Sequence, residues 1–133
     1  QTNGTVSLNF ESITGDYYIV VTHRNTVATS SSSLVSFNSG VATNYDFTTA
    51  DSQAYGDNQV MIETGIYGLY TGDLNQDGYI DATDFPAFDN DNQMGLSNLY
   101  LSTDMNGDGY VDAADFPIFD FGNQNSISSV YPY

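Results

Sequence analysis

The sequence predicts a mainly β fold, a sandwich or small barrel of short antiparallel strands, followed by a small α part made of two loop–helix repeats. Up to about residue 71, apolar and polar residues alternate in short runs separated by Gly, Asn and Ser, which is typical of strands. Beyond residue 72, a twelve-residue acidic loop and a short aromatic segment occur twice, 31 residues apart. We therefore predict two domains, residues 1–71 and 72–133, with the second packed against the first.

The strands predicted in the first domain follow this alternation. In Thr5–Phe10 the apolar residues Val6, Leu8 and Phe10 share one face, and polar residues share the other. The run Asp16–Arg24 begins with apolar residues on both faces, which predicts a central strand. Further strands are predicted over Thr26–Ser30, Leu34–Phe37, Val41–Phe47, Gln59–Thr64 and Ile66–Tyr70.

The charge balance excludes several classes of function. The formal net charge is −16, the single Lys or Arg is Arg24, and 11 of the 17 acidic residues lie between Asp73 and Asp120. Phosphate-binding surfaces need Lys and Arg, so we predict no nucleic-acid partner and no attraction to anionic membranes. The apolar runs are far too short to cross a bilayer, so we predict no membrane insertion. The chain has no cysteine, which excludes disulfides and thiolate metal sites. The excess of acidic over basic side chains instead suits the binding of divalent cations.

Each acidic loop has the residue pattern of a calcium-binding loop of the EF-hand type. Residues 73–84 read DLNQDGYIDATD, and residues 104–115 read DMNGDGYVDAAD. Oxygen-bearing side chains occupy positions 1, 3, 5, 9 and 12, and glycine at position 6 permits a sharp bend. Calcium prefers six to eight oxygen ligands in a flexible cage, whereas magnesium demands tighter octahedral geometry. We predict two bound Ca²⁺ ions that stabilise the fold, because the aspartates would otherwise repel one another.

In each loop, five side chains and one backbone carbonyl are the predicted ligands. In the first loop they are Asp73, Asn75, Asp77, Asp81 and Asp84, with the carbonyl of Tyr79. In the second loop they are Asp104, Asn106, Asp108, Asp112 and Asp115, with the carbonyl of Tyr110. Ile80 and Val111, at position 8, are predicted to form a short β-bridge between the two loops.

A short helix is predicted after each loop. Asp81 and Asp112 are predicted to cap these helices, with the twelfth loop residue in the first turn. Pro86 and Pro117 lie early in the helices, so we expect short or distorted helices of about two turns. Their apolar side would be made by five phenylalanines, Phe85, Phe88, Phe116, Phe119 and Phe121.

The duplicated loop–helix unit resembles the type I dockerin repeat over roughly Gly72–Gly122. This resemblance implies calcium binding and docking onto a cohesin partner through the helix residues after the loops, here Phe85–Phe88 and Phe116–Phe119. Three segments are similar to carboxy-terminal modules of large secreted proteins of Bacteroidota-type bacteria; they read DYYIVVTHRN, YDFTTADSQAYG and GDLNQDGYIDATDFPAFDN. That second resemblance implies a non-catalytic surface or assembly module.

Catalytic interpretations find little support in the sequence. His23, the single histidine, lies beside Arg24 in a strand pattern, where a structural or surface role is typical. Glu11 and Glu63 could form a carboxylate pair for glycoside cleavage. The residues around them, however, predict only the surface of β-strands and no catalytic motif. Arg24 is predicted to pair with a carboxylate. We predict that the chain is not an enzyme.

These observations predict a secreted, non-catalytic assembly module associated with the cell surface. Its partner would be another protein or copies of itself, and Thr5–Phe10 would add to a neighbour's sheet edge to build an extracellular filament. Two alternatives stay open: a dockerin-type docking module for a cohesin-like partner, and a carbohydrate-binding module of a larger secreted enzyme, because tyrosine rings stack on sugars. The sequon Asn3-Gly4-Thr5 leaves a glycan open.

Overall fold

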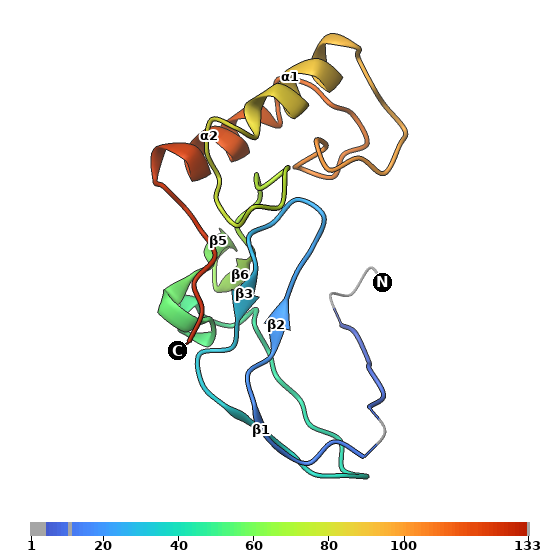
Figure 1. Cartoon of the computed structure of the whole chain (residues 1–133). Helices are drawn as coiled ribbons and strands as arrows, with labels where there is room; N and C mark the ends of the chain where they lie inside the picture. Colours follow the sequence, from blue (N-terminus) through green and yellow to red (C-terminus); the bar gives the residue numbers. More distant parts are fainter. Residues whose placement is uncertain (1–4, 11, 133) are drawn as a thin grey trace.

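The computed structural model describes residues 5–10 and 12–132 and shows helices at one end and strands at the other (Figure 1). The strands are β1 (Gly15–Tyr17), β2 (Val20–Val21), β3 (Thr29–Ser30), β4 (Val35–Phe37), β5 (Val60–Glu63) and β6 (Ile66–Gly68). Two 3-10 turns, η1 (Asp51–Gln53) and η2 (Tyr55–Asp57), precede β5. The helices are α1 (Phe85–Gln93) and α2 (Phe116–Gln124), and the C-terminal segment returns from α2 to the strands.

The strands form three antiparallel two-stranded sheets, which are β1–β4, β2–β3 and β5–β6. The registers place Asp16 opposite Ser36 in the first sheet and Met61 opposite Tyr67 in the third. The prediction of short antiparallel strands is therefore confirmed, but a sandwich or barrel is not. The predicted central strand Asp16–Arg24 is divided into β1 and β2, which pair with different partners.

Two predicted strands are not formed. Thr5–Phe10 belongs to no strand of the structure, and neither does Val41–Phe47. In the second segment, Asp46 accepts hydrogen bonds from the backbone N–H and the hydroxyl of Thr48, at 2.8 and 2.6 Å. This local side-chain turn competes with ladder pairing, because it bends the backbone just where the strand would continue.

The largest apolar core lies between the two repeats. Its buried members are Val27, Ile80, Phe88, Met105, Val111 and Phe119. Five of these six residues come from the repeats, and Val27 comes from the segment between β2 and β3. The β part buries few apolar side chains of its own; among the residues described there, Ala28 and Ala54 are the other buried hydrophobic ones. The β part is therefore held largely by its contact with the repeats, and the domain boundary at residue 71 stays a prediction.

The helices begin later than predicted. Asp84 and Asp115 are the residues immediately before α1 and α2, so the prediction that Asp81 and Asp112 cap them is wrong. Asp81 instead accepts a hydrogen bond from the N–H of Thr83 at 2.8 Å. Each helix has nine residues and its proline in the first turn, where no intrahelical N–H bond is needed. The helices are therefore short, as predicted, and the prolines fit without distortion.

The two repeats interlock, but not through the predicted bridge between Ile80 and Val111. The N–H of Ile80 donates to the carbonyl of Ile127 at 2.9 Å, and the N–H of Val111 donates to the carbonyl of Leu96 at 2.9 Å. Each loop thus pairs with the segment that follows the other repeat's helix, and the two acceptor residues, Leu96 and Ile127, lie 31 residues apart like the loops themselves. The segments after α1 and α2 therefore close the fold around both loops.

Candidate metal centre

The twelfth residue of each loop is a buried carboxylate that organises the loop backbone. Oδ1 of Asp84 accepts the N–H groups of Leu74 at 2.7 Å and Asn75 at 3.0 Å, and its Oδ2 accepts that of Asp81 at 2.9 Å. Asp115 repeats this pattern with the N–H groups of the corresponding second-loop residues, at 2.7, 3.0 and 3.0 Å. Both side chains are fully buried. Three backbone donors thus fix the position of each carboxylate.

The first loop residue is also buried. Asp73 accepts the N–H groups of Asp77 and Gly78, both at 3.1 Å, and Asp104 accepts that of Gly109 at 3.0 Å. Gly78 and Gly109 have φ of 90°, a left-handed conformation that glycine adopts without a steric penalty. Burial raises the pKa of Asp73 above its usual range; the N–H of Gly78 acts against this rise, and the negative charge of Asp84 adds to it.

The side chains at positions 3, 5 and 9 are exposed and engage in short local bonds. In the first loop, Asn75 accepts the N–H of Asp77 at 2.9 Å, and Asp77 accepts that of Tyr79 at 3.0 Å. The hydroxyl of Thr83, followed by its N–H, lowers the pKa of Asp81. The rings of Tyr79 and Tyr110 point outward and are exposed, which leaves their backbone carbonyls as the groups with a role in the loop.

The buried loop carboxylates have no basic side chain beside them. Arg24 donates from Nε to the carbonyl of Leu101 at 2.9 Å, and its guanidinium lies 3.6 Å from the centroid of the Tyr100 ring. Within the described residues it pairs with no carboxylate, so that prediction is wrong. His23 joins the same cluster, with Nε2 at 3.0 Å from the hydroxyl of Tyr100. The negative charge of the loops is therefore uncompensated by protein cations.

The donor set fits a hard cation. In the part of the chain that the structure describes, no three acidic or histidine side chains are arranged so that they could hold a metal ion. Oxygen atoms of Asp73 and Asp84 accept backbone N–H groups of the loop. A carboxylate has about four lone-pair sites, so Asp84, with three amide donors, keeps capacity for a cation. The ligands are all oxygen atoms, which suits calcium rather than softer metals. The ligand roles stay a prediction.

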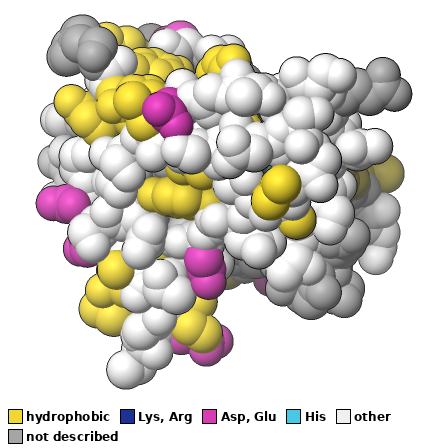
Figure 2. Space-filling model, turned by 90° about the horizontal axis from the view of Figure 1, so that it is seen from below, with side chains coloured by type: hydrophobic (Ala, Val, Ile, Leu, Met, Phe, Trp, Pro, Cys, Tyr) yellow, Lys and Arg dark blue, Asp and Glu magenta, His cyan; other side chains and the backbone are white. Residues whose placement is uncertain are grey.

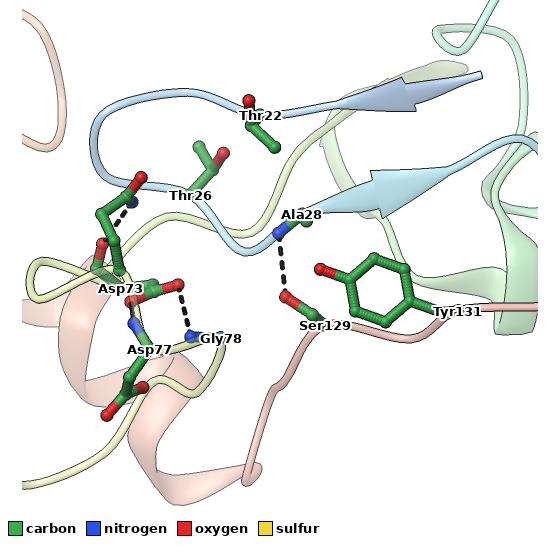
Figure 3. A pocket seen from close by; sticks show the side chains of 9 residues that line it. Thr22, Thr26, Ala28, Asp73, Asp77, Gly78, Ser129 and Tyr131 are labelled. Atoms are coloured by element: carbon green, nitrogen blue, oxygen red, sulfur yellow. Dashed lines mark hydrogen bonds between the residues drawn. The ribbon is translucent and has the colours of Figure 1, made fainter.

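A small cavity lies beside the first loop, between the β2–β3 turn and the C-terminal segment (Figure 3). Its volume is about 180 Å³, and its lining combines loop carboxylates with hydroxyl groups of Thr22, Thr26, Ser129 and Tyr131. Ser129 accepts the N–H of Ala28 at 3.0 Å and so ties the chain end to the β part. The four hydroxyl-bearing residues carry no motif and are far from the loop in sequence, so their place beside it could not be predicted from local patterns.

Comparison with known families matches the repeats alone. Residues 71–119 match the family model of the dockerin type I domain. This segment is a dockerin-like calcium-binding repeat. The dockerin-like segment contains both acidic loops and α1, and the match ends within α2. Neither a curated protein nor a solved structure shows a significant match to the chain. The resemblance to Bacteroidota modules stays a prediction.

Three further predictions concern other parts of the chain. None of the described helices is long and apolar enough to span a membrane. Asn3 of the sequon and Glu11 of the predicted carboxylate pair lie outside the described residues. Glu63 lies at the end of β5, on an exposed hairpin.

Proposed function

We propose that the chain is a secreted, non-catalytic module that binds two Ca²⁺ ions and mediates protein–protein association at the cell surface. The observation that carries the proposal is the set of four buried carboxylates, Asp73, Asp84, Asp104 and Asp115, in a dockerin-like segment without a basic partner. Burying a carboxylate is costly; backbone N–H groups offset part of that cost here, but they leave the negative charges of each loop without a cation. A bound cation in each loop would supply that compensation, and the repeats would then support the β part.

In this proposal each loop holds one ion with the six groups predicted from its sequence. The first loop supplies Asp73, Asn75, Asp77, Asp81 and Asp84 with the carbonyl of Tyr79, and the second supplies Asp104, Asn106, Asp108, Asp112 and Asp115 with the carbonyl of Tyr110. Bound calcium would neutralise part of the net charge of −16 and lower the repulsion between neighbouring molecules. The ions therefore serve folding and association together.

The proposed partner is a further copy of the chain, assembled into an extracellular filament. In the segment Thr5–Phe10, the apolar residues Val6, Leu8 and Phe10 support this choice, because they alternate with polar residues, are exposed and belong to no strand. Strand addition to a sheet edge is a common means of joining protein chains.

A second candidate is docking onto a cohesin-like protein through the helix starts. Phe85 and Phe116 are 37% and 39% exposed although they are large apolar residues, and their ring centroids lie 6.1 Å apart. Together they make a symmetric aromatic surface at the point where the dockerin resemblance implies a partner. Substituting both residues by Ser would abolish binding of such a partner but leave self-association unchanged.

The proposal is tested by calcium titration of chelator-stripped protein, followed by sedimentation with and without calcium. We expect about two ions per chain by the stoichiometry of heat release and high-mass species in calcium that chelator dissociates. A monomer that binds calcium and a cohesin-like protein would favour the second candidate. Calcium-bound protein that is monomeric and retained on a glycan column would instead favour a carbohydrate-binding module. Absence of calcium binding would overturn the proposal.

A further inference from the structure

A segment that pairs with no strand among the described residues extends from the β end of the molecule. We call residues 6–10 the arm, and they belong to no strand. In Figure 1 the arm is separated from the sheets, and β2 lies between the arm and β5. The apolar side chains of the arm, Val6, Leu8 and Phe10, are 75%, 69% and 56% exposed. Three large apolar side chains that alternate along a segment are unfavourable to leave in water, because burying each of them lowers the free energy.

A matching acceptor is present on the hairpin β5–β6. β6 pairs with one edge of β5, and among the described residues no other strand pairs with the opposite edge. Met61 and Ile62 in β5 are 57% and 63% exposed. The outer edge of β6 is partly covered, because the N–H of Tyr67 donates to the carbonyl of Thr48 at 2.9 Å. The free edge of β5 is therefore the better template for an added strand.

The charge distribution favours contact between these two segments of different molecules. Residues 1–10 carry no charged side chain, and Glu63 is the single charged residue between positions 58 and 72. Most of the acidic residues lie in the repeats at the opposite end. Figure 2, which views the strand end, shows apolar side chains at the surface with scattered carboxylates among them. Two copies can therefore approach through the arm and hairpin with little repulsion despite their net charge.

We propose that the arm of one copy adds as a third strand to the free edge of β5 in a second copy. This inference rests on the proposed function and names the surfaces that join its subunits. Because the arm and β5 are different surfaces, the contact is heterologous, and each subunit offers an acceptor while it donates an arm. Repetition of that contact gives a ring or an open filament rather than a closed twofold dimer.

The chain contains no cysteine, so introduced cysteines report this contact without interference. Ser7→Cys protein is mixed with Ile62→Cys protein in calcium under mild oxidation, and covalent heterodimers are counted by mass. The matched control replaces Ile62→Cys by Ser52→Cys, an exposed position in η1 outside the hairpin. We expect heterodimer with Ile62→Cys at a yield at least tenfold above the control. Equal yields would overturn the proposal.

A second measurement examines the apolar face of the arm without relying on a cross-link. Leu8→Asp and Ser7→Asp add the same charge to opposite faces of an exposed segment, so neither change should unfold the protein. We expect Leu8→Asp to weaken self-association at least tenfold and Ser7→Asp to weaken it much less. Equal effects of the two changes would overturn the proposal.

Two further outcomes distinguish a failure of the arm contact from a failure of the proposed function. A cross-link that forms only within a single chain carrying both cysteines would show that the arm pairs with its own hairpin, which also overturns the inference. Calcium binding by the same samples is measured in parallel. Retained calcium binding without intermolecular cross-links would refute the arm contact alone, whereas lost calcium binding would refute the proposed function.

Discussion

The substitution Asp84→Asn is expected to remove most of the stabilisation that calcium gives to the protein. Asp84 is fully buried, and its two oxygen atoms accept three backbone N–H groups. The amide oxygen of asparagine can still accept the N–H groups of Leu74 and Asn75. Its NH₂ group, however, would face the N–H of Asp81, and two donors repel each other. The variant therefore loses one charge-assisted bond and one negative charge at the proposed ion site.

The magnitude has a calcium-free and a calcium-dependent part. A hydrogen bond to a charged group contributes about 1.5–3 kcal/mol, and relief of repulsion with Asp73 offsets some of its loss, so we expect the calcium-free variant to lose about 1–2 kcal/mol. Losing a charged ligand should lower calcium affinity by about a hundredfold or more. Such a loss removes about 2.7 kcal/mol of stabilisation at a saturating calcium concentration.

The assay is urea unfolding in calcium and in chelator. The control Asp89→Asn removes the same charge from α1, where Asp89 accepts a hydrogen bond from the exposed side chain of Gln93 at 2.7 Å. We expect this control to keep the full calcium-induced gain in the free energy of unfolding. Asp115→Asn, the symmetric change, should behave like Asp84→Asn. A folded Asp84→Asn protein with the full gain would refute the proposed ligand role.

Three further predictions address packing, protonation and the contact between the two parts. Gly122→Ala should destabilise the protein by about 1–3 kcal/mol, because the added Cβ would lie 2.8 Å from two carbons of Ile80; Ile80→Val should recover part of this loss in a double-mutant cycle of thermal unfolding. Without calcium, Asp73 has a raised pKa in the folded chain and a pKa of 3.8 in the unfolded chain. At pH values between these two, the folded chain therefore binds more protons at Asp73 than the unfolded chain does. Stability should therefore fall as pH rises through that window, and Asp73→Asn, followed by urea unfolding at stepped pH, should lack this slope. Arg24→Lys should cost about 0.5–1 kcal/mol in thermal unfolding, because lysine keeps the charge but loses the planar guanidinium over Tyr100; an unchanged melting temperature would count against that contact.

The parts of the structure that were predicted correctly depend on local sequence. Loop positions, short helices and several strands follow from residues that are neighbours in the chain. Asp73 and Asp84 lie in one twelve-residue loop, and each accepts backbone N–H groups of that same loop. The match of residues 71–119 to the dockerin type I model confirms that this segment is a dockerin-like repeat, whereas the ligand roles of single residues stay a prediction.

The parts that were missed depend on contacts between distant segments. Alternation shows that a segment can form a strand, but it does not choose its partner, so the division of Asp16–Arg24 between β4 and β3 was not foreseen. The bridge predicted between Ile80 and Val111 failed for the same reason, because each residue pairs instead with a chain segment beyond a helix. Val27 gave no sign that it enters the core of the repeats.

The central claim is that the two acidic loops hold calcium and that this calcium stabilises the fold. Native mass spectrometry of chelator-stripped protein, titrated with calcium, counts the bound ions directly, and thermal unfolding of the same samples reports their effect. The account predicts two ions per chain and a melting temperature that rises as they bind. A chain that takes up no calcium, or takes it up with an unchanged melting temperature, would contradict it.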